Sequence, residues 1–367
     1  MSNTGGDATV HRFPCDSCGA DMRFAPEAAA MQCDHCGNQA EIEGVAAQTR
    51  PVVELDLVDA LNTLPKEEFQ LSESVHCDNC GANFFLETNV EHSGTCPFCA
   101  SPVVVDPQKM RQIRPTGVLP FALSETAART QMGAWLGSLW FAPSGLQKFA
   151  RRGRKLNGVY IPYWTYDARS DSRYSGERGD IYTTYETRLI DGQPKQVAVQ
   201  RIRWHHASGR VPYFHDDVLI SASKTLPKDV EHGLSTWDLS RLEPYHPELL
   251  AGFRSEAYQI DHKDGFEHAR AIIDRTILRE IKYDIGGDRQ RVHSVKTNLS
   301  DLTFKHVLLP MWIASYRYRG KTYRITINGQ SGQIHGQRPY SAIKIFFAAT
   351  CTLLIAAGIA YIAANSQ

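Results

Sequence analysis

Acidic residues are missing from one end of the chain, and basic residues are scarce at the other. No Asp or Glu follows Asp301, whereas seven Lys or Arg residues do. Residues 1–100 hold sixteen acidic and four basic residues, a formal charge of −12 in a 367-residue chain whose total is zero. Zinc modules that bind nucleic acid need Lys and Arg to replace phosphate counterions. We therefore expect the N-terminal part to repel polyanions and the C-terminal part to attract anionic surfaces.

Signatures of the common catalytic centres are also absent. The chain has no H-E-x-x-H metalloprotease motif, no G-x-S-x-G elbow and no G-x-G-x-x-G fingerprint. Several side chains of the central region suit metal binding or proton transfer, but no companion motif assigns them a reaction. These are His205, His206, His215, Asp216 and Asp217. We expect a protein that is not an enzyme; a redox or hydrolytic enzyme is the rival hypothesis, and it requires a catalytic metal.

No secretory signal is visible at the N-terminus, because residues 1–10 are polar and contain no apolar stretch. Eight of the nine cysteines lie in four C-x-x-C pairs within the first hundred residues. Such pairs are typical of metal ligation in a reducing compartment rather than of a disulfide framework. We therefore expect the N-terminal part to remain in the cytosol.

The four cysteine pairs form two sets with one pattern. Fourteen residues separate Cys18 from Cys33 in the first set, and fifteen separate Cys80 from Cys96 in the second. Two such pairs complete a closed tetrahedron around a metal, which makes the metal structural. We predict two structural zinc ions, with iron in a rubredoxin-like site as the alternative, and place the neighbouring His35 and His76 on the surface. The predicted zinc ligands are Cys15, Cys18, Cys33, Cys36, Cys77, Cys80, Cys96 and Cys99.

A long uncharged run lies near the C-terminus. The twenty residues from Ile345 to Ala364 carry no charge, and as a helix they span about 30 Å, the thickness of one hydrocarbon core. Arg338 and Lys344 precede this run, whereas only Asn-Ser-Gln follows it. The excess of positive charge before the span predicts a single-pass anchor with the large N-terminal part in the cytoplasm. The basic residues before the span are also candidates for binding anionic lipid headgroups.

The middle region contains an internal echo. The segment Val159–Trp164 (Val-Tyr-Ile-Pro-Tyr-Trp) resembles Val307–Trp312 (Val-Leu-Leu-Pro-Met-Trp), and corresponding residues are 148 positions apart. Helix patterns open at Ser124 and at Asp264, before each echo. We therefore predict two related α+β subdomains.

Other segments supply smaller predictions. Leu55, Val58, Leu61 and Leu64 lie near helical spacing and predict a short amphipathic helix between the cysteine sets. Five cations in residues 148–155 are interpreted as a solvated loop, with lipid headgroups or nucleic acid as alternative ligands. The predicted fold is multidomain α+β. Its parts are zinc ribbon 1–45, linker 46–72, zinc ribbon 73–106, subdomains 115–255 and 256–338, and transmembrane helix 344–364.

Three segments carry a resemblance to a known family. They are Leu309–Tyr323, Ile327–Gly332 and Arg338–Ser341, which read Leu-Pro-Met-Trp-Ile-Ala-Ser-Tyr-Arg-Tyr-Arg-Gly-Lys-Thr-Tyr, Ile-Asn-Gly-Gln-Ser-Gly and Arg-Pro-Tyr-Ser. The chain resembles, over nearly its whole length, a bacterial family of zinc-ribbon membrane proteins. Its members carry the labels "TFIIB-type zinc ribbon-containing protein" and "primosomal protein N′ (replication factor Y), superfamily II helicase".

The resemblance implies that the eight cysteines are the family's zinc ligands, and it assigns no catalytic residue. It also implies a role in membrane stress, with flotillin-like (SPFH) or phage-shock-type partners at the bacterial inner membrane. A helicase motor is rejected, because its phosphate loop is absent. The leading hypothesis is a non-enzymatic membrane-anchored adaptor, and the alternative is a nucleic-acid-binding ribbon factor for replication or transcription.

Overall fold

The computed structural model describes residues 12–42, 52–62, 68–85, 93–104, 108–143, 146, 156–190, 193–234, 236–318 and 321–365. Leu64 of the expected linker helix and the basic run 148–155 lie outside these residues. The described part is an α+β structure with two cysteine clusters near the N-terminus and one apolar helix at the C-terminal end.

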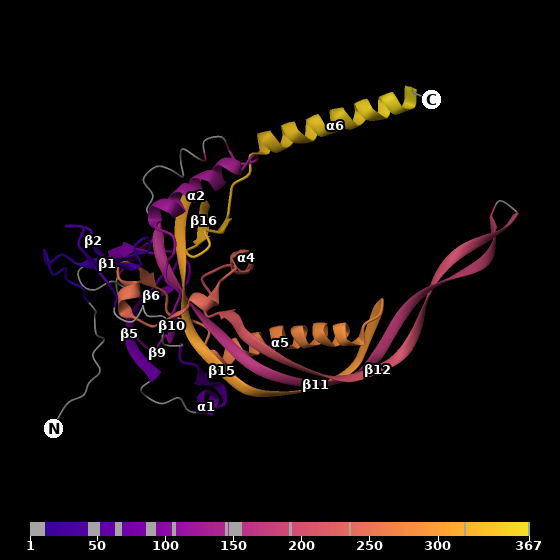
Figure 1. The fold of residues 1–367 in the computed structure, drawn as a ribbon. Helices are drawn as coiled ribbons and strands as arrows, with labels where there is room; N and C mark the ends of the chain where they lie inside the picture. Colours follow the sequence, from indigo (N-terminus) through magenta and orange to yellow (C-terminus); the bar gives the residue numbers. More distant parts are fainter. Residues whose placement is uncertain are drawn as a thin grey trace.

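Three unusually long strands form the centre of the molecule. They are β11 (Asn157–Ile190), β12 (Gln193–Ser221) and β15 (Arg289–Tyr318), in the order β12-β11-β15. Figure 1 shows them as one long curved ribbon. Both neighbours run antiparallel to β11. The pairing with β15 stops at Gly179, so that β11 and β12 continue alone as a two-stranded arm.

Short strands complete this central sheet. β10 pairs in parallel with β15 and β14 pairs in parallel with β11, whereas the remaining short strands pair antiparallel. They are β4 (Leu55–Asp56), β10 (Gly117–Val118), β13 (Glu243–Pro244), β14 (Arg254–Ser255), β16 (Lys321–Asn328) and β17 (Ile334–Gly336). The strand expected around Ile325 is therefore present as β16.

The long helix α5 (His262–Ile285) lies along the concave face of the ribbon (Figure 1). The expectation that Asp264 opens this helix is wrong, because the side chain of Asp261 accepts the backbone N–H groups of Lys263 and Asp264 and so caps it earlier. The helix ends, as expected, at Gly286, whose φ of +65° suits glycine. Its buried face includes Ala269, Ile273, Ile277 and Ile281.

The helix α2 (Glu125–Ser138) begins where it was expected, with the Ser124 side chain accepting the N–H of Ala127. In the linker, α1 (Leu57–Asn62) is present, but it buries Leu57 and Ala60 and leaves Val58 52% exposed. Of the residues expected on its apolar face, Leu61 packs against the core, whereas Val58 does not, and Leu55 lies in β4 opposite Phe304 because the helix starts only at Leu57. The remaining short helical elements are α4 (Lys228–Gly233), η2 (Leu239–Arg241) and η3 (Pro247–Leu250).

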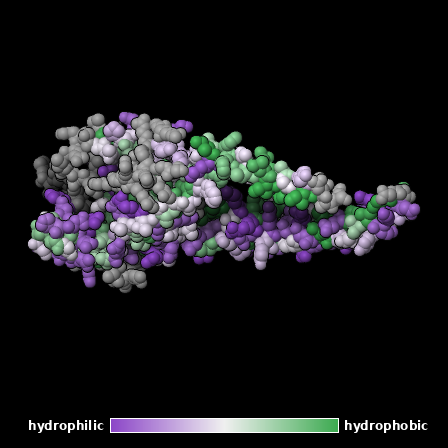
Figure 2. All heavy atoms as spheres, turned by 90° about the horizontal axis from the view of Figure 1, so that it is seen from above, coloured by the Kyte–Doolittle hydropathy of each residue, from purple (hydrophilic) through white to green (hydrophobic). Residues whose placement is uncertain are grey.

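The helix α6 (Ala342–Asn365) projects away from the rest of the structure (Figure 1). Residues Ala342–Ala363 have a mean hydropathy of 2.2, and none of this stretch is buried. Figure 2 shows the hydrophobic side chains gathered along this helix. Within the described residues it is the one helix long and apolar enough to cross a membrane.

The cysteine-containing segments form small sheets of their own. The first contains β1 (Met22–Ala25), β2 (Ala30–Cys33) and β3 (Gln39–Ala40). The second contains a three-stranded sheet and a separate hairpin. Its strands are β5 (Phe69–His76), β6 (Asn83–Phe85), β7 (Ser93–Thr95), β8 (Pro102–Val104) and β9 (Gln108–Ile113).

The two sequence echoes lie on neighbouring strands. In the antiparallel register of β11 and β15, Tyr160 is opposite Pro310 and Ile161 is opposite Leu309. Two short strands also pair at corresponding positions of the echoes. β10 pairs with Val307 and Leu308 of β15, and β14 pairs with Val159 and Tyr160 of β11, which are the corresponding residues. The two predicted subdomains thus contribute their central strands to one continuous sheet.

Candidate metal centres

Each C-x-x-C pair forms the same tight turn. The carbonyl oxygen of the first cysteine accepts the N–H of the residue after the second, at 2.8 Å for Gly19 onto Cys15 and 2.9 Å for Ala100 onto Cys96. These residues have φ of +75° and +58°, and the two remaining turns contain glycine with the same sign of φ. The left-handed conformation explains glycine after three of the pairs.

These turns bring the eight thiols together in two groups. Within each group the four sulfur atoms lie within 4.8 Å of one another. The Sγ atoms of Cys18 and Cys33 are 3.5 Å apart, and those of Cys77 and Cys99 are 3.7 Å apart. A tetrahedral ion with bonds of about 2.3 Å to sulfur separates its ligands by about 3.8 Å. The structure thus forms two four-sulfur sites of the size of a metal shell.

None of the described cysteines is in a disulfide. The N–H of Ser17 points at the Cys15 sulfur and is the main cause that lowers the pKa of this thiol, to about 6. Backbone N–H groups thus favour the thiolate of Cys15, which is the form that binds metals. In the same turn the Ala20 N–H lowers the pKa of Cys18, but hydrogen bonds with the Cys33 and Cys36 thiols outweigh it and raise that pKa to about 12. Cys351 lies apart from both sites, on α6.

The two sites differ in how they are enclosed. In the first, Cys18 and Cys36 are exposed, whereas in the second only Cys80 is not fully buried. The second site packs into the same apolar cluster as Val159 and Leu309 of the central strands. Side chains from distant parts of the chain also donate hydrogen bonds to this site. Ser315 Oγ donates to the carbonyl of Phe98 at 2.6 Å, and the Gln259 side chain donates to the carbonyl of Gly81 at 2.6 Å. The second site is therefore the more enclosed of the two.

The first site also packs against the core, because Cys15 and Cys33 belong to the same apolar cluster as Trp312, but it carries exposed acidic side chains. Its two described cations are already paired, because Arg12 lies 3.0 Å from Asp21 and Arg23 lies 2.7 Å from Asp34. Asp16, inside the first turn, is exposed. The described surface of this module therefore offers carboxylates and no free guanidinium group to a partner.

The histidines beside the cysteines remain outside the sulfur clusters. His35 is exposed, and His76 Nδ1 lies 2.6 Å from the Asn83 side-chain oxygen. Neither belongs to a potential metal group among the described residues. This agrees with their predicted surface positions.

The histidines and aspartates of the central region are not brought together as one site. His205 and His206 are exposed on β12, whereas His215 is buried with its Nε2 atom 3.0 Å from Ser170 Oγ. Burial lowers the pKa of His215, which favours the neutral ring. Asp217 instead forms an ion pair with Lys305 at 2.8 Å. The described residues thus place these five side chains in separate surroundings.

Sequence reasoning missed a buried charge cluster around Lys305. Its ammonium lies 3.2 Å from Asp167, 2.8 Å from Asp217 and 3.0 Å from Glu54. The pairing register shifts at Asp167, and Asp217 has a φ of +49°, so the cluster marks an irregularity of the sheet. A lysine within an apolar strand is the one sequence signal for it.

Comparison with known proteins adds one relative. The chain is 25% identical over 339 residues to the protein printed as "Uncharacterized protein YdjG" of Bacillus subtilis (strain 168), and the match covers 91% of each chain. No family model matches the chain. No solved structure matches it either. The similarity therefore extends over most of both chains, and the relative's name assigns no activity.

Proposed function

We propose that the chain is a non-enzymatic adaptor that α6 holds at the cytoplasmic membrane and whose acidic zinc ribbons bind a protein. The observation that carries this proposal is the separation of its parts: a metal module with exposed acidic side chains near the N-terminus and an exposed apolar helix at the other end of the chain. A module with exposed carboxylates suits a cationic protein surface. The second site, whose cysteines are more enclosed, has a structural role.

Zinc is the metal of this proposal, because four thiolates in a closed tetrahedron suit zinc and leave no position for a substrate. With zinc bound, each site would carry a formal charge of −2. This adds to the charge of −12 of residues 1–100. We retain iron as the alternative that metal analysis separates.

The central region is proposed as a duplicated α+β unit. Its support is the pairing of the echo strands and the equal spacing before the two helices, because the caps Ser124 and Asp261 both follow the preceding short strand by six residues. The duplicated sheet would serve as the rigid body that joins the ribbons to α6.

The partner proposed from the family resemblance is a flotillin-like (SPFH) or phage-shock-type membrane protein. The test is a crosslinking pull-down of the full-length protein from native membranes. Asp16→Lys combined with Glu27→Lys reverses two exposed charges of the first ribbon, and Asp216→Lys combined with Glu267→Lys is the control at exposed acidic positions elsewhere. We expect the first variant to lose a membrane-scaffold protein that the control retains.

The nucleic-acid alternative has a direct readout in the same experiment. Recovery of nucleic acid or replication proteins with the wild type, sensitive to salt, would overturn the adaptor proposal. The paired arginines of the first ribbon and its carboxylates disfavour that outcome.

A further inference from the structure

The segment that follows α2 exposes two aromatic side chains between two buried residues. Leu139 and Ala142 are 8% and 5% exposed and pack into the core, whereas Trp140 is 80% exposed and Phe141 is 40% exposed. Folding therefore fixes the ends of this short segment and directs its aromatic residues outward. We call Trp140 and Phe141, together with the 61% exposed Tyr340, the aromatic foot.

Hydrogen bonds fix this segment to the base of α6. The ammonium of Lys344 donates to the carbonyl oxygens of Trp140, at 3.1 Å, and Ala142, at 2.8 Å. The backbone N–H of Ser341 donates to the carbonyl of Phe141 at 2.8 Å. The aromatic foot is therefore held beside the first turns of α6.

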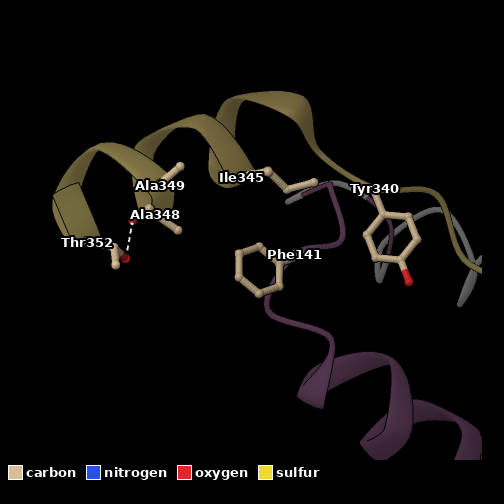
Figure 3. A pocket seen from close by; sticks show the side chains of 6 residues that line it. All are labelled: Phe141, Tyr340, Ile345, Ala348, Ala349 and Thr352. Atoms are coloured by element: carbon tan, nitrogen blue, oxygen red, sulfur yellow. Dashed lines mark hydrogen bonds between the residues drawn. The ribbon is translucent and has the colours of Figure 1, made fainter.

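An apolar groove lies between the foot and α6, as Figure 3 shows. Phe141 and Tyr340 form one wall, and the helix contributes the other. Arg338 lies over the Tyr340 ring, with its guanidinium carbon 5.3 Å from the ring centroid. The helix residues that line the groove are Ile345, Ala348, Ala349 and Thr352.

We propose that the aromatic foot is a second membrane contact, which lies in the interfacial layer of the bilayer that α6 enters, with a lipid acyl chain in the groove. The proposal rests on the membrane anchoring of α6. The occupant is lipid because the first three turns of α6 form one wall of the groove, so that a bilayer surrounding those turns reaches the groove directly. Trp and Tyr favour this layer, where their rings are apolar at one end and polar at the other.

This contact gives the membrane two points of attachment to the body of the protein. A single helix leaves the attached domain free to tilt, whereas a helix and a fixed aromatic foot beside it restrict the tilt. The Lys344 ammonium then holds the two contacts together, because it lies on α6 and donates hydrogen bonds to the backbone carbonyls of Trp140 and Ala142.

The test uses full-length protein in vesicles of phosphatidylcholine and phosphatidylglycerol brominated near the headgroups. Trp140 is the one exposed tryptophan among the six of the chain, and α6 contains none, so bromine quenching reports the foot and not the helix. We expect Trp140→Phe to lower the quenched fraction of the emission about twofold or more. Trp204→Phe, at a half-buried tryptophan beneath Arg291, is the matched control and should not lower the quenched fraction.

The outcomes separate this inference from the proposed anchor. Equal quenching of the wild type and Trp140→Phe, in protein that still floats with the vesicles, would overturn the aromatic foot and leave the anchor intact. Protein that fails to float would overturn both. Because Trp140 is 80% exposed, its replacement leaves the fold unchanged.

Discussion

Ile161 of β11 and Leu309 of β15 lie directly opposite each other, although they are corresponding residues of two sequence echoes. An antiparallel pair in which a residue faces its own counterpart has a local twofold relationship at that point. The parallel pairings of β10 with β15 and β14 with β11 obey the same relationship. This is the arrangement that two copies of one unit would adopt if each unit gave its long strand to a shared sheet.

The two metal sites should release their ions at different rates. Cys18 and Cys36 of the first site are exposed, whereas three ligands of the second are buried. A chelator should therefore remove one metal ion quickly and the second slowly from full-length protein, as measured with a colorimetric metal indicator. Cys18→Ser should leave about one ion and only the slow phase. A metal content well below two ions per wild-type chain would contradict the presence of two metal sites.

Removing the Lys305 ammonium should destabilise the central sheet. Lys305→Met leaves the buried Asp167 without its cation, and breaking a buried pair costs roughly 3–5 kcal/mol. Urea unfolding followed by tryptophan fluorescence measures this loss, with the exposed Lys296→Met on the same strand as the control. Combining Lys305→Met with Asp167→Asn should recover part of the stability. No recovery in the double variant would show that the ion pair is not the cause.

The stability of the protein should depend on pH through Glu256. Burial raises the pKa of this carboxyl to about 8, above its unfolded value of about 4.3. Its Oε1 atom accepts a hydrogen bond from Thr225, whereas Oε2 has no partner among the described residues. The folded protein thus binds a proton that the unfolded chain has lost, so this group costs stability as pH rises from about 4.3 to 8.

Glu256→Gln removes that titration while keeping the shape of the side chain. Relative to the wild type, the variant should gain stability by about 1.4 kcal/mol per pH unit between pH 5 and 8. Unfolding curves of both proteins across this range measure the difference. A difference that is constant with pH would mean that Glu256 is not protonated in the folded protein.

A methyl group at Gly265 should destabilise the packing of α5 on the sheet. A Cβ atom there would lie 2.5 Å from Tyr166 Oη and 2.8 Å from a Trp164 ring carbon. The overpacking costs about 1–3 kcal/mol and outweighs the helix propensity of alanine, which favours Gly265→Ala by about 1 kcal/mol. Thermal unfolding measures the net loss. Gly358→Ala on α6, where no atom lies within 4 Å, is the control and should not lower the stability.

Loss of the Lys344 hydrogen bonds should loosen the segment after α2 without detaching the protein from membranes. Lys344→Met removes both hydrogen bonds to the carbonyls of Trp140 and Ala142. Hydrogen exchange should become faster at residues 140–142, whereas vesicle flotation should be unchanged because α6 keeps its apolar length. Lys321→Met, at an exposed lysine of β16, provides the control.

Local patterns predicted the parts of the structure that depend on local chemistry. The cysteine spacing predicted the two sulfur clusters, Ser124 predicted the start of α2, and the uncharged run predicted α6. The error at α5 was also local, because Asp261 and Asp264 are both suitable caps and only the backbone shows which one accepts hydrogen bonds. Capping residues alone therefore place a helix start only within a few residues.

The remaining features depend on contacts between distant residues. Lys305 and Asp167 are 138 positions apart, and no pattern in the sequence joins them. The exposed pair Trp140 and Phe141 was likewise not distinguished from core aromatics, since its orientation follows from Leu139 and Ala142 being buried on either side. The length of β11, at 34 residues, also exceeds the usual strand of five or six.

The enclosure of the second cysteine cluster has a consequence for synthesis of the chain. Ser315, which donates to the carbonyl of Phe98, follows Cys99 by 216 residues. At usual rates of translation these residues take roughly 10–40 s to appear. The thiols of this cluster are thus made long before the strands that cover them, so the nascent chain should take up its metal while still on the ribosome. The apolar helix α6 follows these strands in the chain, so a chain that takes up no metal would still carry this exposed helix.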